Sequence, residues 1–415
     1  MKKIKYNYDE VIYEENLENG LKVFMYPTNK TKNFYITVST HFGAEVMKYK
    51  KNDKVYEVTK GSAHFLEHRV MDFTKNKKAM EKINEYGSLV NAYTTYNGTN
   101  YNIFGNEKII ENMELLFDAV FKANIRKEDV EKERGIILEE YYMYNDDPYF
   151  LLQTKVNENV FNKSFIKYPV LGTTNGIETV TDKELTRLYN DFYTLDNMFI
   201  VVTGNFNKDS VLDYIKEYTS KLKKTKCISK VMKEKESINV VTQYEEIIMN
   251  LNEPKVMIGY KIKLDKKINI IKYKMILGMA LGEIFGSTGD AFLELNEMGI
   301  SRYGYEYEVV DDYIIVYFKA STSKTSEFIN TINKYITKIS LNKDSLDRKR
   351  KRKLSSMILL FEDFMGVEDM ITTDMFTHNK LLNKREEILN SITLNDTKEI
   401  LINIDWINKS TLIIK

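Results

Sequence analysis

The stretch "TDKELTRLYNDFYTLDNMFIVVTGNF", Thr181–Phe206, joins a helix to a strand and indicates how the chain is layered. Its first residues form a Thr-x-x-Glu pattern, which is typical of a capping box at the first turn of a helix. The run "MFIVV", Met198–Val202, is apolar throughout and has the length of a strand, so we expect it to be buried. A helix followed by a buried strand is typical of a sheet covered by helices.

The N-terminal side of this stretch continues the same layering. The elements that we predict there are a hairpin turning at Asn19-Gly20, a strand at 33–43, helices at 61–73 and 75–87, two strands within 88–105 that turn at Asn97-Gly98, two helices between 107 and 145, and a loop at 168–180. The helix at 61–73 follows a Gly-Ser start that can cap it. This order predicts an α+β fold, with helices packed on one face of a mostly antiparallel sheet.

The C-terminal side repeats this order in outline, with "INVVTQY" at 238–244 as its first strand. Between the two halves, the chain is polar and rich in lysine. We therefore predict two similar domains, an N-terminal domain at 1–220 and a C-terminal domain at 238–415, joined by a linker at 221–237.

The charge balance and the cysteine count exclude several classes of protein. The chain has 61 basic and 60 acidic side chains. Its net charge of +1 gives no general attraction to nucleic acid or anionic lipid. A single cysteine, Cys227, excludes a disulfide framework and a cysteine-rich zinc site. The first residues lack the apolar core of a secretory signal, and no apolar run has the length of a membrane span. We expect a cytoplasmic protein.

The motif "SAHFLEHRV", Ser62–Val70, indicates a metal site. His64 and His68 are two of the four histidines in the chain, and their spacing places both on one face of a helix. Each can offer a ring nitrogen to the same ion, and zinc favours such ligands. Glu67 is placed to take a proton from water beside that ion. The pattern H-x-x-E-H is the inverzincin signature, although a solvated helix face explains the histidine pair alone.

A third zinc ligand has to come from elsewhere in the chain. His41 and His378 are the only other histidines, so a carboxylate is the expected ligand. The segment "EKERGIILEEYYMYNDDP", residues 131–148, places Glu133 and Glu140 seven residues apart on one helix face. From the residues alone, an ordinary charged helix face explains these two glutamates as well.

Four segments together resemble the pitrilysin family of zinc metallopeptidases, which includes insulin-degrading enzyme and mitochondrial processing peptidase. The segments are "GSAHFLEH" at 61–68, "EYGSLVNAYTTYNGTNY" at 85–101, "EKERGIILEEYYMYNDDP" at 131–148 and "YPVLGTTNGIETVTDKELTRLYNDFYTLDNMFIVVTGNF" at 168–206. In the last of them Gly172, the pair Asn197-Met198 and Gly204 are in register with the family. The resemblance implies a zinc-dependent endopeptidase that hydrolyses unstructured peptides.

The resemblance also implies a role for each site residue. It makes His64, His68 and Glu140 the ligands of Zn²⁺, Glu67 the general base, and Glu133 a partner that orients the ligands. It also implies that substrate peptides bind along an edge strand, whose residues are Asn91, Ala92, Tyr93 and Thr94.

The segment "GDAFLELNEMGISRYGY", residues 289–305, departs from the family. The family carries an arginine there and, seven residues later, a tyrosine with a catalytic role. Tyr303 matches the tyrosine, but Asn296 occupies the arginine position. The departure implies a zinc-bearing subunit whose related partner supplies the Arg/Tyr pair and closes a chamber around the peptide. A homodimer in which the nearby Arg302 compensates is the alternative.

Two other functions compete with the peptidase. One is a non-catalytic relative that binds peptides or organises an assembly, and the complete set of His64, Glu67, His68 and Glu140 argues against it. The other is nucleic-acid binding by the basic run at 348–353, which fits a solvated helix face better because the run contains no aromatic residues. Arg69 follows the histidine motif in the run "RVMDF", where the family more often has a Met-Leu-Phe-Lys-like run, and no inference is drawn from this departure.

Overall fold

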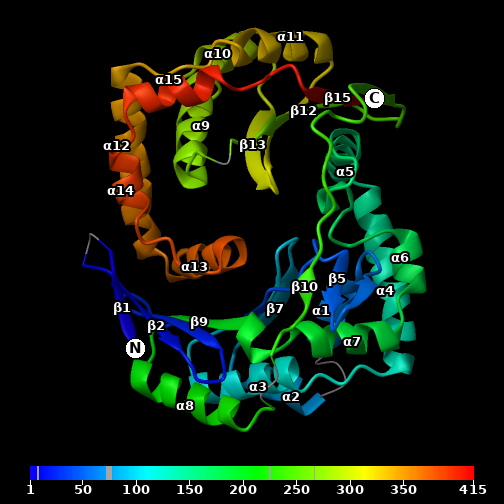
Figure 1. Cartoon of the computed structure of the whole chain (residues 1–415), viewed down its shortest axis with the longest axis vertical. Coiled ribbons are helices and arrows are strands. Elements are labelled where there is room, and N and C mark those ends of the chain that lie inside the picture. Colours follow the sequence, from blue (N-terminus) through cyan, green and yellow to red (C-terminus); the bar gives the residue numbers. More distant parts are fainter. Residues whose placement is uncertain (7–8, 72–76, 224–225, 266) are drawn as a thin grey trace. The chain divides into compact units, whose positions relative to one another are not determined.

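The computed structural model describes residues 1–6, 9–71, 77–223, 226–265 and 267–415 (Figure 1). The chain forms two compact units. The first contains residues 1–141, 169–233 and 357–383, and the second contains 142–168, 234–356 and 384–415. Within the described ranges, no helix is both long and apolar enough to cross a membrane.

The first unit is built on a seven-stranded sheet. In spatial order its strands are β1 (Lys2–Lys5), β2 (Val11–Asn16), β3 (Lys22–Pro27), β9 (Met198–Gly204), β4 (Phe34–Thr40), β8 (Thr99–Gly105) and β7 (Leu89–Thr94). All neighbouring strands pair antiparallel except β3 and β9. The sheet confirms the predicted layer, and β7 lies at its edge.

Helices cover the sheet because its strands carry apolar side chains on their faces. The helices of this unit are α1 (Ser62–Val70), α2 (Lys77–Glu85), α3 (Ile109–Phe121), α4 (Lys127–Asn145, whose last residues belong to the second unit), α6 (Thr174–Thr179), α7 (Asp182–Phe192), α8 (Lys208–Ser220) and α13 (Phe364–His378). Apolar side chains of α1, α3, α7 and α8 form one core with one face of the sheet. Figure 1 shows α3 and α8 alongside it.

One helix covers the opposite face of the same sheet, which the sequence did not predict. Val367, Ile371 and Met375 of α13 form a separate core with strand residues that include Phe24 and Phe199. Because both faces are covered, β4 and β9 are buried at every position, as the apolar run of β9 predicted.

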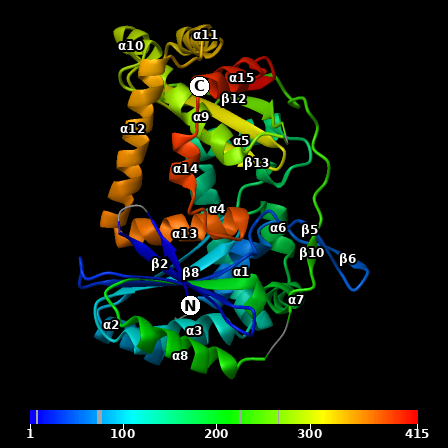
Figure 2. The ribbon, with the colours of Figure 1, turned by 60° about the vertical axis from the view of Figure 1, so that its left-hand side comes forward.

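A small three-stranded sheet also belongs to the first unit. Its order is β10 (Lys230–Val231), β5 (Lys48–Lys51) and β6 (Lys54–Glu57). Figure 2 shows the β5–β6 hairpin with β10 beside it. Both pairings are antiparallel, so a segment of the predicted linker pairs with a hairpin near the start of α1.

Most predicted elements are confirmed, and the errors have local causes. Gly20 has a φ of 95° in the hairpin that joins β2 to β3. The predicted loop at 168–180 contains α6, which begins where the side chain of Thr173 accepts a hydrogen bond from the N–H of Gly176. Residues 72–73, at the end of the first predicted helix, and residues 75–76, at the start of the second, lie outside the described residues.

The second unit contains a five-stranded sheet and seven α-helices within the described ranges. The strands, in spatial order, are β11 (Tyr244–Ile247), β15 (Lys409–Ile414), β12 (Lys255–Lys263), β14 (Tyr313–Ser321) and β13 (Tyr303–Val310). The helices are α5 (Pro148–Val160), α9 (Ile270–Ile284), α10 (Asp290–Glu297), α11 (Thr325–Ile336), α12 (Lys343–Leu359, whose last residues belong to the first unit), α14 (Arg385–Asn390) and α15 (Leu394–Ile402). Only β11 and β15 pair in parallel. The strand predicted at 238–244 begins only at Tyr244.

The two units differ from the predicted continuous halves by two exchanged segments. Helix α5 lies in the N-terminal half but belongs to the second unit, and α13 lies in the C-terminal half but belongs to the first. Gly259 of β12 lies against Val156 and Val160 of α5 so closely that a Cβ there would approach their methyl groups to 2.9 and 3.2 Å. Sequence order alone cannot reveal such an exchange, because it depends on which apolar faces are complementary.

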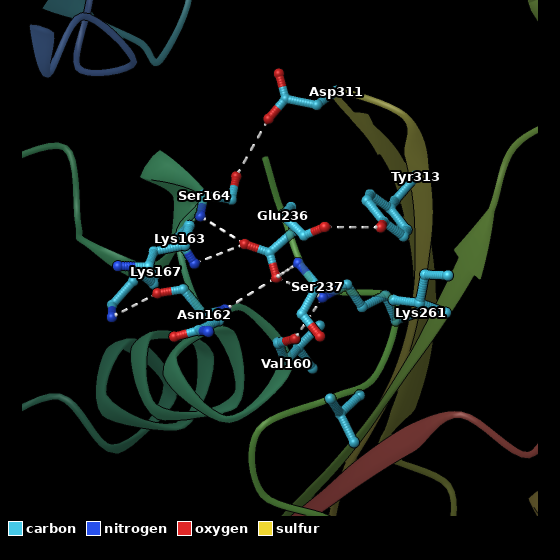
Figure 3. Close-up of polar contacts among 12 residues, drawn as sticks. Val160, Asn162, Lys163, Ser164, Lys167, Glu236, Ser237, Lys261, Asp311 and Tyr313 are labelled. Carbon is cyan, nitrogen blue, oxygen red and sulfur yellow. Dashed lines mark hydrogen bonds and ion pairs between the residues drawn. The ribbon is translucent and has the colours of Figure 1, made fainter. Parts of the chain in front are cut away.

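The polar linker contains a buried anchor, Glu236 (Figure 3). Its carboxylate accepts hydrogen bonds from the backbone N–H groups of residues 162–164, at 2.6–3.0 Å. The Nζ atom of Lys261 donates to the same carboxylate at 2.8 Å, and both side chains are almost fully buried. Burial raises the pKa of Glu236, but the hydrogen bonds from Lys261 and the three amides outweigh it, so that the net shift is downward. The end of the predicted linker is therefore fixed to the second unit.

Replacing Lys261 with methionine is expected to lower the free energy of unfolding by about 3 kcal/mol, because it leaves the Glu236 carboxylate buried without its cation. Lys263→Met is a matched control two residues away, since the ion pair between Lys263 and Asp312 is exposed and contributes little. Urea denaturation of both variants measures the difference. Equal stability of the two variants would contradict the anchoring role of Glu236.

Candidate metal centre

Helix α1 carries the histidine motif and begins at a glycine. Gly61 precedes it with a φ of 95°, and no side chain caps the helix start. The prediction that the Gly-Ser pair caps the helix is therefore wrong for Ser62, because Ser62 is already the first residue of the helix. Among the residues that the structure describes, the buried Ser62 hydroxyl has no hydrogen-bond partner.

A close backbone contact fixes this helix start. A Cβ on Gly61 would lie 2.5 Å from the carbonyl oxygen of Leu171, and a Cβ on Gly172 would lie 2.4 Å from that of Lys60. Glu184 of α7 accepts hydrogen bonds from both the N–H and the hydroxyl of Thr59. The predicted capping box is thus only half formed, because Glu184 binds the segment that precedes α1. The N-cap half of the box, from Thr181, is present.

The two histidines and Glu140 converge, as the resemblance to the family implied. The Nε2 atoms of His64 and His68 lie 3.7 and 3.5 Å from Oε2 of Glu140. Ligand atoms from all three residues lie within 4.8 Å of one another. Tetrahedral zinc with bonds of about 2.0–2.2 Å places its ligands about 3.3–3.6 Å apart, and the two distances to Glu140 lie within this range or just above it, so this donor set suits the ion.

Helix α4 supplies the carboxylate. Glu133 and Glu140 lie nearly two turns apart on one face of α4, as their spacing predicted, and this face is turned toward α1. Oε1 of Glu133 lies 2.9 Å from Nδ1 of His68. The imidazole of His68 is therefore held on both sides, by Glu133 at Nδ1 and by Glu140 at Nε2.

The side chain of Arg69 does not face solvent. Its side chain is 2% exposed, and Nη1 donates to Oε2 of Glu133 at 2.7 Å. The sequence did not reveal this contact, because the partner lies 64 residues away on another helix. The available signal was the chemistry of arginine, whose planar fork matches a carboxylate.

Glu67 lies beside the same centre and is buried at 9% exposure. The hydroxyl of Thr94, at the end of β7, donates to its Oε2 at 2.7 Å. Burial raises the pKa of the Glu67 carboxyl, while the hydrogen bond from Thr94 and the charge of His68 oppose the shift. A carboxylate with a raised pKa is suited to accepting a proton near neutral pH.

The two histidines titrate in opposite directions. Burial and the nearby charge of His68 lower the pKa of His64 to about 4. Burial also disfavours the charged form of His68, but hydrogen bonds to Glu133 and Glu140 outweigh it and raise its pKa to about 9. At neutral pH the imidazole of His68 in the metal-free protein is therefore positively charged, with both ring nitrogens protonated, whereas that of His64 is neutral.

Zinc affinity is expected to rise with pH, because the proton on His68 has to leave before its nitrogen can bind an ion. The raised pKa of about 9 places the effect between about pH 7 and pH 9, with a gain of up to about tenfold for each pH unit and a plateau above. Competition with a chelator of known affinity measures it. An affinity that stays constant across this range would contradict the prediction.

The edge strand β7 packs against α1, and β8 is the only strand that pairs with it in the described part of the chain. Its residues pair with β8 from Leu89↔Phe104 to Thr94↔Thr99. Asn91 is exposed, and its Oδ1 atom accepts the N–H of Ala92 at 2.9 Å. Tyr93 is half-buried. The structure thus places the predicted peptide strand at a sheet edge beside α1, and its role in binding stays a prediction.

The predicted tyrosine and arginine positions lie in the second unit. The Tyr303 hydroxyl, on β13, donates to the carbonyl of Phe285 at 2.8 Å. Asn296 is half-buried on α10, and Arg302 is exposed just before β13. Their catalytic and compensating roles stay predictions.

The basic run at 348–353 lies on α12, as predicted. Arg348 pairs with Glu283, Lys349 donates to the carbonyl of Gly282, and Arg350 pairs with Asp347. These partners belong to its own unit, which favours a structural role over nucleic-acid binding.

Comparison with known proteins identifies relatives of both halves. Residues 55–174 match the family profile described as Insulinase (Peptidase family M16), and residues 179–353 match the profile described as Peptidase M16 inactive domain. The uncharacterized zinc protease YmfH of Bacillus subtilis is 24% identical over 404 residues, which cover 94% of this chain and 93% of YmfH.

Solved structures share the fold. An M16-like peptidase from Alicyclobacillus acidocaldarius superposes with a TM-score of 0.90 at 20% identity, covering 97% of each chain. The periplasmic protease PqqL of Escherichia coli superposes with a TM-score of 0.77 at 17% identity, covering all of this chain but 48% of PqqL.

Proposed function

The chain belongs to the M16 family of peptidases, whose cofactor is zinc, and from this premise we propose that it is a zinc-dependent endopeptidase that hydrolyses unstructured peptides. The observation that carries the proposal is the convergence of His64, His68 and Glu140 beside the buried carboxylate of Glu67. These residues lie within the part that matches the Insulinase profile, whereas the inactive-domain profile matches the later part. This division favours catalysis by the first unit over a purely binding role.

Zinc, when bound by these three residues, supplies Lewis acidity toward a carbonyl and makes water more acidic. The chain's own groups do the rest. Glu67 accepts a proton from the attacking water and returns it to the leaving amine. Thr94 holds the carboxylate of Glu67 by one oxygen, which leaves the other oxygen for the proton. Glu133 keeps the Nδ1 side of His68 occupied, so that Nε2 is the nitrogen available to the ion.

The expected substrate is an extended peptide. Strand β7 lies at the edge of the described sheet next to α1, and an extended chain can add to such an edge through backbone hydrogen bonds. This mode of binding selects for an extended conformation more than for particular side chains. Folded proteins cannot offer a free strand, so unstructured peptides are favoured.

A second chain is part of the proposal. This chain covers 48% of PqqL, which supports the idea that a complete chamber needs about twice its length. Asn296 stands where the family has arginine, so the partner is expected to be a related chain that supplies an Arg/Tyr pair. A homodimer that uses Arg302 is the alternative. The cytoplasmic location remains part of the same proposal.

The test is to isolate the tagged chain from its own cells and measure zinc, mass and cleavage of a quenched fluorescent peptide in the same fractions. We expect one zinc per chain of 48.8 kDa, cleavage that a zinc chelator abolishes, and activity only in fractions that contain a second chain. Cleavage by a monomer would contradict the two-chain arrangement. Absence of chelator-sensitive cleavage in every zinc-containing fraction would contradict the peptidase.

A further inference from the structure

His64 and His68 differ in how their outer nitrogens are held. Nδ1 of His68 meets Oε1 of Glu133 at 2.9 Å. Nδ1 of His64 is buried and, within the described part of the chain, meets no hydrogen-bond partner. Hydrogen bonding at Nδ1 determines which ring nitrogen is free for an ion. For this pair, that control is exerted at His68 through Glu133.

Glu133 is itself held at its other oxygen. Oε2 accepts a hydrogen bond from Nη1 of Arg69 at 2.7 Å, so the carboxylate lies between an imidazole and a guanidinium. Such charge-assisted bonds are short and directional. Arg69 and His68 are neighbours on α1, and both reach the same glutamate on α4. The contact therefore fixes the carboxylate plane as well as its position.

Arg69 is an unusual residue to bury. Its side chain is 2% exposed, and arginine is rarely buried unless it is paired. The planar guanidinium matches the geometry of a carboxylate, and its Nη1 contact with Oε2 of Glu133 supplies that pairing. Arg69 binds Glu133, and Glu133 contacts the proposed ligand His68, so Arg69 can influence the metal centre without contacting the ion.

We propose that Arg69 is a positioning residue for the metal centre, an inference that rests on the proposed function. It holds Oε2 of Glu133 so that Oε1 faces Nδ1 of His68, and this directs Nε2 of His68 toward the ion. Loss of Arg69 frees the carboxylate to rotate, and His68 is then no longer held in the orientation that zinc requires. Partners of this kind change metal affinity when they are removed.

The experiment measures the zinc dissociation constant of the full chain by chelator competition, together with the visible spectrum of the Co²⁺-substituted chain. Arg69→Met is expected to weaken zinc binding about 10–100-fold and to change the cobalt spectrum. Arg69→Lys is expected to fall between Arg69→Met and the unchanged chain, because an ammonium replaces the charge but not the planar fork. If Arg69→Met does not fold, Arg69→Lys carries the test.

Arg134→Met is the matched control. Arg134 follows Glu133 on α4 and donates to the carbonyls of Ile177 and Val180, away from Glu133. Its loss is expected to lower stability but to leave zinc affinity and the cobalt spectrum unchanged. A zinc defect of equal size in Arg69→Met and Arg134→Met would show general loosening and overturn the proposal.

A double-variant cycle shows whether Arg69 acts through Glu133. The variant that combines Arg69→Met with Glu133→Gln is expected to bind zinc as weakly as Glu133→Gln alone, because both changes remove the same restraint. Additive losses, or wild-type affinity in the Arg69 variants, would overturn the proposal. If Arg69→Met binds zinc with wild-type affinity and cleaves the peptide normally, the proposal for Arg69 fails and the proposed peptidase function stands. If the variants change zinc affinity as expected but the unchanged chain cleaves no peptide, the proposed peptidase function fails and the proposal for Arg69 stands.

Discussion

Replacing Glu67 with glutamine is expected to leave zinc bound and to lower kcat for peptide hydrolysis by about 10³-fold or more. The change keeps the shape of the side chain and its place beside Thr94, but an amide cannot accept the proton of the attacking water. Because Glu67 is not among the residues that converge on the ion, the metal content is expected to stay at one zinc per chain. The loss is therefore expected in kcat, with little change in metal affinity.

Cleavage of a quenched fluorescent peptide and elemental analysis of the same sample measure the two effects. Glu139→Gln provides a control, since Glu139 is an exposed carboxylate next to the ligand Glu140 on α4. That variant is expected to cleave normally. A Glu67→Gln enzyme with normal kcat would show that another group accepts the proton.

Replacing His68 with alanine is expected to remove zinc altogether at micromolar protein concentration. The change deletes one of three ligands and also the imidazole that Glu133 and Glu140 both contact. Structural and catalytic zinc sites need at least three protein ligands. We expect the affinity to fall by more than about 10³-fold, and the peptidase activity to fall with it.

His41→Ala is a control for the loss of a half-buried imidazole. His41 lies in the same unit, and its ring packs against Phe199 and Phe376, outside the group of residues that converge on the ion. That variant is expected to be less stable but to retain one zinc. Stoichiometric zinc in His68→Ala would contradict the metal centre as described.

The convergence of His64, His68 and Glu140 could be predicted in part because it depends on local spacing. The spacing of His64 and His68 on one helix, and of Glu133 and Glu140 on another, follows directly from helical periodicity. That the two helices face each other came from resemblance to a family. Local patterns do not contain that information.

The sequence did not predict what depends on contacts between distant segments. The residues around Arg69 in its own helix do not indicate that it is buried. Its contact with Glu133 on α4 explains the burial. In the sequence, Glu236 is one of several charged residues in a polar linker. In the folded chain, Lys261 and the amides of residues 162–164 surround its carboxylate. Such buried charges are stable only as pairs, and a pair is visible only in the folded chain.

The exchange of α5 and α13 between the units means that a break in the polypeptide near residue 225 would not release two autonomous domains. A fragment that ended there would lack α13 and would leave Phe24 and Phe199 of its sheet in contact with water. The remaining fragment would lack α5, whose Val156 and Val160 cover Gly259. The two products are complementary fragments, each of which holds a helix that the other needs. Nicked chain is therefore expected to stay associated and to unfold as one particle.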